Sequence, residues 1–174
     1  GLASAYGIIK NHGGGIRAYS EKGVGTTFHI YLPASEREAV QKKSLQEDIQ
    51  KGSETLLLVD DEAMIIEVGR QLLEMLGYRV FTAGSGEEAL RIFQENRAEI
   101  DLVILDMIMP RMTGGDAYDR LKEIDPHIKT LLSSGYSLDG QAAEILKRGC
   151  NGFIQKPFNT RDLSRKLREV LEKN

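Results

Sequence analysis

The sequence predicts an α/β fold from residue 54 onward, a five-stranded parallel sheet with helices on both faces. Short apolar runs alternate with segments whose apolar residues recur at helical spacing, so strand and helix follow each other along the chain. The apolar runs are nearly continuous, which is typical of parallel strands buried on both faces. Because crossover connections between parallel strands are right-handed, few topologies are compatible with this order.

Five segments are expected to form the strands, because each is short, apolar and followed by polar or turn-forming residues. They lie at 55–59, 78–82, 101–106, 128–134 and 152–155.

The first helix is expected to follow the first strand. It places Ile65, Val68, Leu72 and Leu76 on one face, and Gly77 is positioned to end it.

Side chains that cap helix N-termini mark two of the later helices. Ser85 and Glu88 form a capping-box signature, and Thr160 is placed to cap the last helix. The remaining helices are expected at about 115–124 and 138–148.

The N-terminal third has a different organisation. Residues 2–12 predict a helix, and 16–20 and 26–32 predict two strands joined through glycines. At 34 residues, the segment 1–34 is too short to hold a core of its own. The charged segment 35–53 is interpreted as a linker.

Composition limits the function classes. The net charge of −3 offers no general attraction for nucleic acid or an anionic membrane, and no apolar run is long enough to span a bilayer. The only cysteine, Cys150, fits a cytoplasmic setting. The chain begins at Gly1 rather than Met, which we interpret as a processed product or a fragment.

Polar side chains are concentrated where the expected strands end. Asp60 and Asp61 follow the first strand, Asp106 ends the third, Ser134 ends the fourth, and Lys156 follows the fifth. Ligands of such sheets bind at the carboxyl ends of the strands. Carboxylates about 4 Å apart repel by about 4 kcal/mol per pair at an effective dielectric of about 20, so a compensating cation is expected. Mg²⁺ suits a few carboxylates plus waters.

A carboxylate, a hard cation, a lysine and a hydroxyl together suit phosphoryl transfer, with aspartate as the covalent nucleophile. Taken singly, Asp60 and Asp61 could merely cap a helix, and Lys156 could be a solvated surface lysine. Their coincidence with Asp106 at matching strand ends favours the site.

Four motifs, LLLVDDE, VILDMIMPRMTG, LLSSGYS and GFIQKPF, resemble the response-regulator receiver domain over residues 54–174. The resemblance implies a flavodoxin-like receiver fold in which Asp106 is the phosphoacceptor. Ser134 would be the switch hydroxyl, Lys156 the cation that pairs with the phosphate, and Phe153 the aromatic that changes rotamer on activation.

The same resemblance implies a Mg²⁺ site. Asp61 and Asp106 would be direct ligands, Asp60 a close or water-mediated helper, and the Ile108 backbone carbonyl a further ligand. It also implies a cis peptide bond between Lys156 and Pro157, which X-Pro chemistry permits.

The segments GLASAYGIIKNHGG and GTTFHIYLP resemble the C-terminal end of the ATPase domain of a sensor histidine kinase. The ATP site and the phosphorylated histidine of that family have no counterpart here. The resemblance therefore implies the C-terminal part of a hybrid histidine kinase, whose receiver accepts phosphate from a histidine kinase or a histidine phosphotransfer domain.

Two residues are expected to tune the lifetime of the phosphoryl group. Ile108 and Tyr136 each lie two positions after a site residue, and neither readily aligns a water molecule. We predict slow self-dephosphorylation, with Tyr136 shielding the site.

Other functions remain open at this stage. A phosphatase of the haloacid-dehalogenase type would want an acid two residues after Asp106, where Ile108 stands. A flavodoxin-like cofactor binder or a pseudo-receiver that acts by binding alone are further alternatives. The fourth helix, fifth strand and fifth helix would form the partner face, which is also open to a second copy of the chain.

Overall fold

The computed structural model describes residues 2–23, 25–33, 49–135 and 140–172. The chain forms two compact units, Gly1–Glu47 and Asp48–Asn174. We describe each unit by itself.

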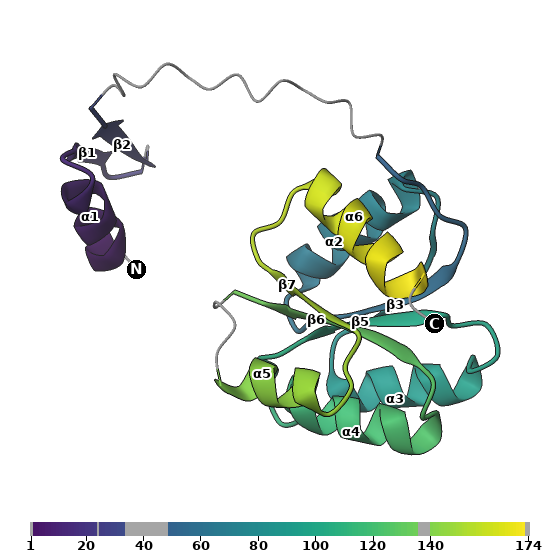
Figure 1. Ribbon diagram of the computed structural model, residues 1–174. Coiled ribbons are helices and arrows are strands. Elements are labelled where there is room, and N and C mark those ends of the chain that lie inside the picture. The colour runs from purple at the N-terminus through teal and green to yellow at the C-terminus, as the bar shows by residue number, and fades with distance from the viewer. Residues whose placement is uncertain (1, 24, 34–48, 136–139, 173–174) are drawn as a thin grey trace. The chain divides into compact units, whose positions relative to one another are not determined.

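The second unit contains the predicted parallel sheet (Figure 1). Its strands are ordered β4-β3-β5-β6-β7, so β3 and β5 are central neighbours and β7 is an edge. The strands are β3 (Thr55–Val59), β4 (Arg79–Ala83), β5 (Leu102–Asp106), β6 (Lys129–Ser134) and β7 (Gly152–Gln155).

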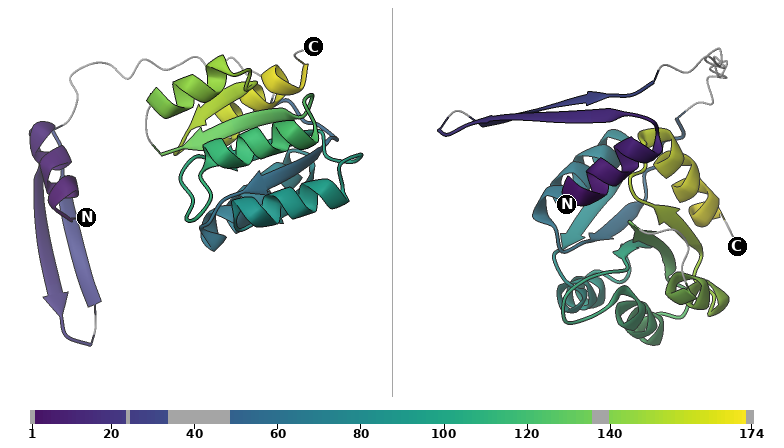
Figure 2. Two further views of the ribbon diagram at one scale, coloured as in Figure 1. Left: turned by 90° about the horizontal axis from the view of Figure 1, so that it is seen from below. Right: turned by 90° about the vertical axis from the view of Figure 1, so that its left-hand side faces the viewer.

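Helices cover both faces of this sheet, as predicted (Figures 1 and 2). One face carries α2 (Ala63–Met75) and α6 (Thr160–Glu172). The other carries α3 (Gly86–Glu95), α4 (Gly114–Ile124) and α5 (Gly140–Lys147). Successive strand residues alternate between two apolar clusters, so Leu58 packs under α2 and α6 while Val59 packs on the opposite side.

Two local expectations were wrong. Val68 is 61% exposed, because the buried face of α2 is centred on Leu73 instead. Thr160 is the first helical residue of α6 rather than its cap; the side chain of Asn159 accepts a hydrogen bond from the Asp162 backbone N–H at 2.9 Å. The Ser85 cap is confirmed, since its hydroxyl accepts from Glu88 N at 3.2 Å.

The first unit is the predicted helix followed by a hairpin. Helix α1 (Leu2–Asn11) precedes strands β1 (Gly15–Glu21) and β2 (Gly25–Tyr31), which pair antiparallel. Ile9 is buried, whereas most other large apolar side chains of this unit are exposed.

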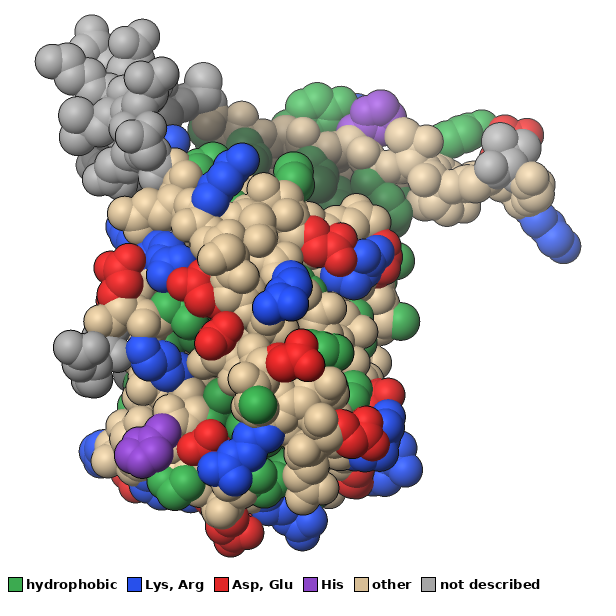
Figure 3. Space-filling view, turned by 90° about the vertical axis from the view of Figure 1, so that its right-hand side faces the viewer, with side chains coloured by type: hydrophobic (Ala, Val, Ile, Leu, Met, Phe, Trp, Pro, Cys, Tyr) green, Lys and Arg blue, Asp and Glu red, His purple; other side chains and the backbone are tan. Residues whose placement is uncertain are grey.

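None of the helices in the described residues is both long and apolar enough to cross a bilayer. On the face of the second unit drawn in Figure 3, acidic and basic side chains are interspersed rather than gathered by sign.

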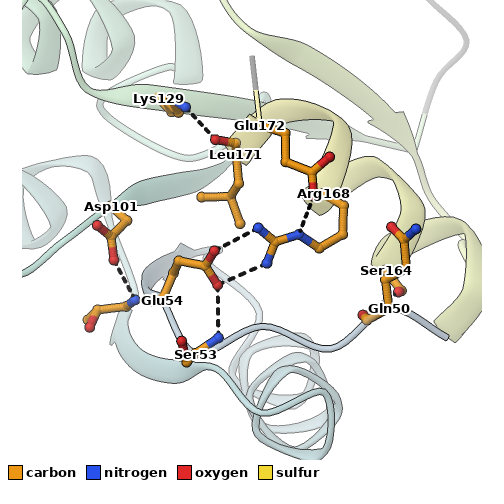
Figure 4. Close-up of polar contacts among 10 residues, drawn as sticks. Gln50, Ser53, Glu54, Asp101, Lys129, Ser164, Arg168, Leu171 and Glu172 are labelled. Carbon is orange, nitrogen blue, oxygen red and sulfur yellow. Dashed lines mark hydrogen bonds and ion pairs between the residues drawn. The ribbon is translucent and has the colours of Figure 1, made fainter. Parts of the chain in front are cut away.

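The segment that leads into β3 is fastened to α6 (Figure 4) and to the residue that follows α2. Arg168 donates two hydrogen bonds to the Glu54 carboxylate, at 2.7 and 3.0 Å, and the buried Ser164 hydroxyl donates to the Gln50 carbonyl at 2.7 Å. Gly52 N donates to the carbonyl of Leu76 at 3.0 Å. Residues 50–54 are therefore held against the rest of the second unit.

The Glu54–Arg168 pair predicts a loss of stability in acid. The hydrogen bonds from Arg168 lower the pKa of Glu54 from 4.5 to about 2. This stabilisation is complete above the ordinary pKa and is lost as the pH falls from 4.5 toward 2. Because the carboxylate is 27% exposed, we expect about 1–2 kcal/mol at neutral pH.

Urea unfolding of wild type and Glu54→Gln at pH 7 and pH 3 would measure this difference. We expect the gap between the two proteins to narrow at the lower pH. Glu172→Gln is the matched control, because Glu172 contacts the same guanidinium at 3.3 Å but is far more exposed. An equal loss in both variants, or a gap that does not change with pH, would contradict the prediction.

Candidate functional site

Two buried carboxylates meet at the carboxyl edge of the sheet. Asp60 directly follows β3 and Asp106 ends β5, and these strands are hydrogen-bonded neighbours. Leu58 and Ile104, two residues earlier on each strand, both belong to the apolar cluster under α2 and α6. Strand alternation therefore directs both carboxylates to that same face.

Lys156 bridges the two carboxylates. Its ammonium group lies 2.5 Å from Asp60 Oδ2 and 2.7 Å from Asp106 Oδ1. The lysine follows β7, so its side chain crosses β6 to reach β5. Its backbone N–H donates to the Ser134 carbonyl at 2.7 Å, and the next peptide bond, to Pro157, is cis as expected.

Backbone N–H groups hold the outer oxygens of the same carboxylates. Glu62 N donates to Asp60 Oδ1 and Ile108 N donates to Asp106 Oδ2, both at 3.0 Å. Each of the four carboxylate oxygens thus has a hydrogen-bond donor, so both side chains are oriented before any ligand arrives.

For both Asp106 and Lys156, burial and ion pairing shift the pKa in opposite directions. Desolvation raises the pKa of Asp106 although Lys156 opposes this. Burial alone would lower the pKa of Lys156, but its hydrogen bonds to Asp106 and Asp60 outweigh burial and raise it. Lys156 is therefore held as a cation against the two carboxylates.

The other predicted site residues differ in how deeply they are buried. Asp61 is exposed, Ser134 is buried at the end of β6, and Phe153 is half-buried against the apolar core. The Ile108 side chain is 59% exposed beside Asp106. Tyr136 lies outside the described residues.

Of the three carboxylates expected to meet at the strand ends, Asp60 and Asp106 share Lys156, whereas Asp61 is exposed. Within the part of the chain that the structure describes, no three His, Cys, Asp or Glu side chains form a metal-holding cluster. The donors still fit Mg²⁺, which binds through one or two carboxylates and keeps several waters. Asp60 and Asp106 supply hard oxygens side by side, and Asp61 is adjacent.

Gly114 was not anticipated as a site residue. It begins α4, and a Cβ atom there would lie 2.3 Å from the Asp106 carbonyl oxygen. A capping box between Thr113 and Asp116 starts the helix directly against Asp106. The T-x-x-D pattern at 113–116 was the available signal for this helix start.

A doubly wound parallel sheet with acidic side chains and a lysine at its carboxyl edge places this chain in the class of CheY-like receivers. The chain belongs to the family described as "Response regulator receiver domain", which it matches over residues 56–168.

Individual relatives agree with this assignment. The chain is 40% identical over 182 residues to the sensor kinase CckA of Brucella abortus, covering 99% of this chain and 19% of that protein. A receiver domain protein from Clostridium thermocellum superposes with a TM-score of 0.66 at 36% identity, covering 68% of this chain and 94% of that one.

A third relative was crystallised with ligands. Response regulator TrrA of Thermotoga maritima, in complex with Mg²⁺ and BeF, has a TM-score of 0.61 at 31% identity, covering 67% of this chain and 98% of that one. The chain spans about a fifth of the length of the sensor kinases that it matches.

Proposed function

We propose that this chain is the receiver-bearing C-terminal part of a hybrid histidine kinase, and that Asp106 accepts a phosphoryl group from a phosphohistidine. The observation that carries the proposal is the pairing of Lys156 with the buried Asp106 carboxylate at 2.7 Å. The match to a sensor kinase along nearly the whole chain supports the hybrid architecture. On this proposal residues 1–34 derive from the ATPase domain, 35–53 connect it, and 54–174 form the receiver.

In the transfer step, an Asp106 oxygen bonds to phosphorus as the bond from phosphorus to the donor's imidazole nitrogen breaks. Lys156 keeps a positive charge beside the product. Mg²⁺, held by Asp61, Asp106 and the Ile108 carbonyl with Asp60 close by, would neutralise charge on the phosphoryl oxygens. The complex of TrrA with Mg²⁺ and BeF supports this choice of metal.

Ser134 then reports the modified state by turning its hydroxyl toward the phosphoryl group, and Phe153 follows by changing rotamer. These changes favour the conformation of the face formed by α5, β7 and α6 that binds the partner. The phosphohistidine donor is the first partner, and a second copy of the chain on this face is a further proposal. We place the chain in the cytoplasm, where the lone Cys150 stays reduced.

Intact-mass spectrometry after incubation with acetyl phosphate tests the proposal. We expect a Mg²⁺-dependent gain of one phosphoryl group in wild type and none in Asp106→Asn. Asp119→Asn, an exposed aspartate on α4, is the matched control and should behave as wild type. No gain in wild type, from acetyl phosphate or from a phosphorylated histidine phosphotransfer domain, would favour a pseudo-receiver.

Ile108 gives a prediction about phosphate lifetime. Its exposed side chain at the rim of the site cannot hydrogen-bond a water molecule. Ile108→Asn supplies an amide that can, so we expect hydrolysis about tenfold faster, below the roughly 10²–10⁴ of a fully positioned general base.

The decay of phosphorylated protein, followed after removal of acetyl phosphate, measures this rate. Ile108→Val is the control that keeps the position apolar and should leave the lifetime unchanged. If phosphorylated Ile108→Asn loses its phosphoryl group at the wild-type rate, the apolar side chain at position 108 does not set the lifetime of the phosphoryl group.

A further inference from the structure

Ser133, on β6 beside Asp106, carries a buried hydroxyl group that no described group binds. Its side chain is 3% exposed, and its Oγ atom has no hydrogen-bond partner among the described residues. Burying a hydroxyl without a partner is unfavourable, and an alanine at this position would avoid the penalty. The hydroxyl is therefore placed for a partner that reaches it in another state of the site.

Ser133 lies in a row of side chains that runs across β5, β6 and β7. It is the register partner of Asp106 on one side and of Ile154 on the other. Leu131, two residues earlier on β6, belongs to the apolar cluster under α2 and α6. Strand alternation therefore puts Ser133 on the same face of the sheet as Asp106. Neighbouring strands lie about 4.8 Å apart, so the hydroxyl is one strand away from the Asp106 carboxylate.

The side chain of Lys156 passes over β6 on this same face. Ile154, two residues earlier along β7, packs in the cluster under α2 and α6, so Lys156 begins on that face and crosses β6 to reach β5. Its ammonium group bonds Asp60 at 2.5 Å and Asp106 at 2.7 Å. An ammonium group has three N–H donors, and these two bonds use two of them.

Lys156 and the proposed Mg²⁺ draw on the same carboxylates. Asp106 would be a direct ligand of the metal and Asp60 would lie close to it, so a bound cation and the ammonium group would be near neighbours. Two positive charges so close together repel strongly. Because Lys156 is anchored just after β7, its way out from the carboxylates leads back over β6, where Ser133 lies.

We propose that Ser133 is a positioning residue, whose Oγ atom accepts a hydrogen bond from the Lys156 ammonium group when a divalent cation occupies the carboxylates. Lys156 would then give up its bond to Asp60 and still remain beside Asp106, with a donor left for an incoming phosphoryl oxygen. This role rests on the proposed function, since it presumes the Mg²⁺ site.

Calorimetric titration of the metal-free whole chain with Mg²⁺ tests the role of Ser133. Ser133→Ala should bind Mg²⁺ about tenfold more weakly, because the displaced ammonium group loses a hydrogen bond. Ser133→Thr keeps a hydroxyl and should bind Mg²⁺ more tightly than Ser133→Ala does. In urea unfolding with a chelator present, Ser133→Ala should be at least as stable as wild type, because the hydroxyl has no described partner in the metal-free protein.

Thr130→Val is the matched control on the same strand. Thr130 is fully buried, and its Oγ1 atom likewise has no hydrogen-bond partner among the described residues. Its register partner is Val103, which packs in the cluster on the opposite face of the sheet from Asp106. Valine has nearly the shape of threonine, so Thr130→Val should be at least as stable as wild type and should bind Mg²⁺ equally tightly.

Wild-type Mg²⁺ affinity in Ser133→Ala would overturn the role of Ser133 and leave the metal site in place. Equal weakening in Thr130→Val would also overturn it, because the effect would then come from packing of β6. Equal weakening in Ser133→Thr and Ser133→Ala would show that the hydroxyl is not the group that matters. If wild type itself does not bind Mg²⁺, the metal site of the proposed function fails, and the role of Ser133 fails with it.

Discussion

Replacing Gly114 by alanine is expected to lower the free energy of unfolding by about 3 kcal/mol, at the upper end of overpacking effects, and to slow phosphoryl transfer to Asp106 sharply. The added methyl group would meet the Asp106 carbonyl oxygen at 2.3 Å and the Met107 Cα at 2.8 Å. Both neighbours are backbone atoms, so no flexible side chain can move aside. Either α4 moves away from β5 or the end of β5 shifts, and Asp106 shifts with it.

Gly115 provides a matched control on the same helix. A Cβ atom there would lie 3.4 Å from Ile145 Cδ1, 3.7 Å from Thr113 Oγ1 and 4.0 Å from Arg148 Nη2, which are ordinary contacts. Gly115→Ala should be neutral or slightly stabilising, because alanine favours a helix by about 0.5–1 kcal/mol over glycine. Urea unfolding and uptake of phosphate from acetyl phosphate measure the two effects. Equal behaviour of the two variants would show that the close approach at Gly114 does not position Asp106.

The sheet was predictable because buried parallel strands leave a plain signature. Runs such as TLLLV and LVILD have no polar residue in their interior, and each is followed or ended by a carboxylate. The meeting of Asp60, Asp106 and Lys156 follows from the same signature, since all carboxyl ends of a parallel sheet lie at one edge.

Side-chain detail was less predictable, for physical reasons. The helical spacing of Val68 fits a buried face, but the buried face of α2 is centred on Leu73 and leaves Val68 at the surface. Asn159 and Thr160 are both competent caps, and only the backbone geometry decides between them.

The sequence also did not determine which group neutralises the carboxylates. Repulsion between carboxylates demands a cation, and either a metal or a lysine satisfies that demand. In the structure Lys156 lies between Asp60 and Asp106, while Asp61 faces outward. The close approach of Gly114 to Asp106 could not be inferred either, since it depends on how α4 docks against β5.

The structure therefore assigns Lys156 a large share of the stability of the metal-free fold. We expect Lys156→Met, measured by urea unfolding at neutral pH with a chelator present, to cost about 3–5 kcal/mol. The Asp60 and Asp106 side chains, 3% and 9% exposed, would then face each other without a cation. Lys166→Met is the control, because the pair between Lys166 and Glu169 lies at the surface and should contribute less than about 1 kcal/mol.

A double variant separates charge repulsion from lost packing. Lys156→Met combined with Asp60→Asn removes one of the two facing carboxylates, so it should regain most of the lost stability despite carrying two changes. Added Mg²⁺ should stabilise Lys156→Met more than wild type, because the metal would replace the missing charge. If the double variant is less stable than Lys156→Met, then the lysine acts through packing of its side chain rather than through its charge.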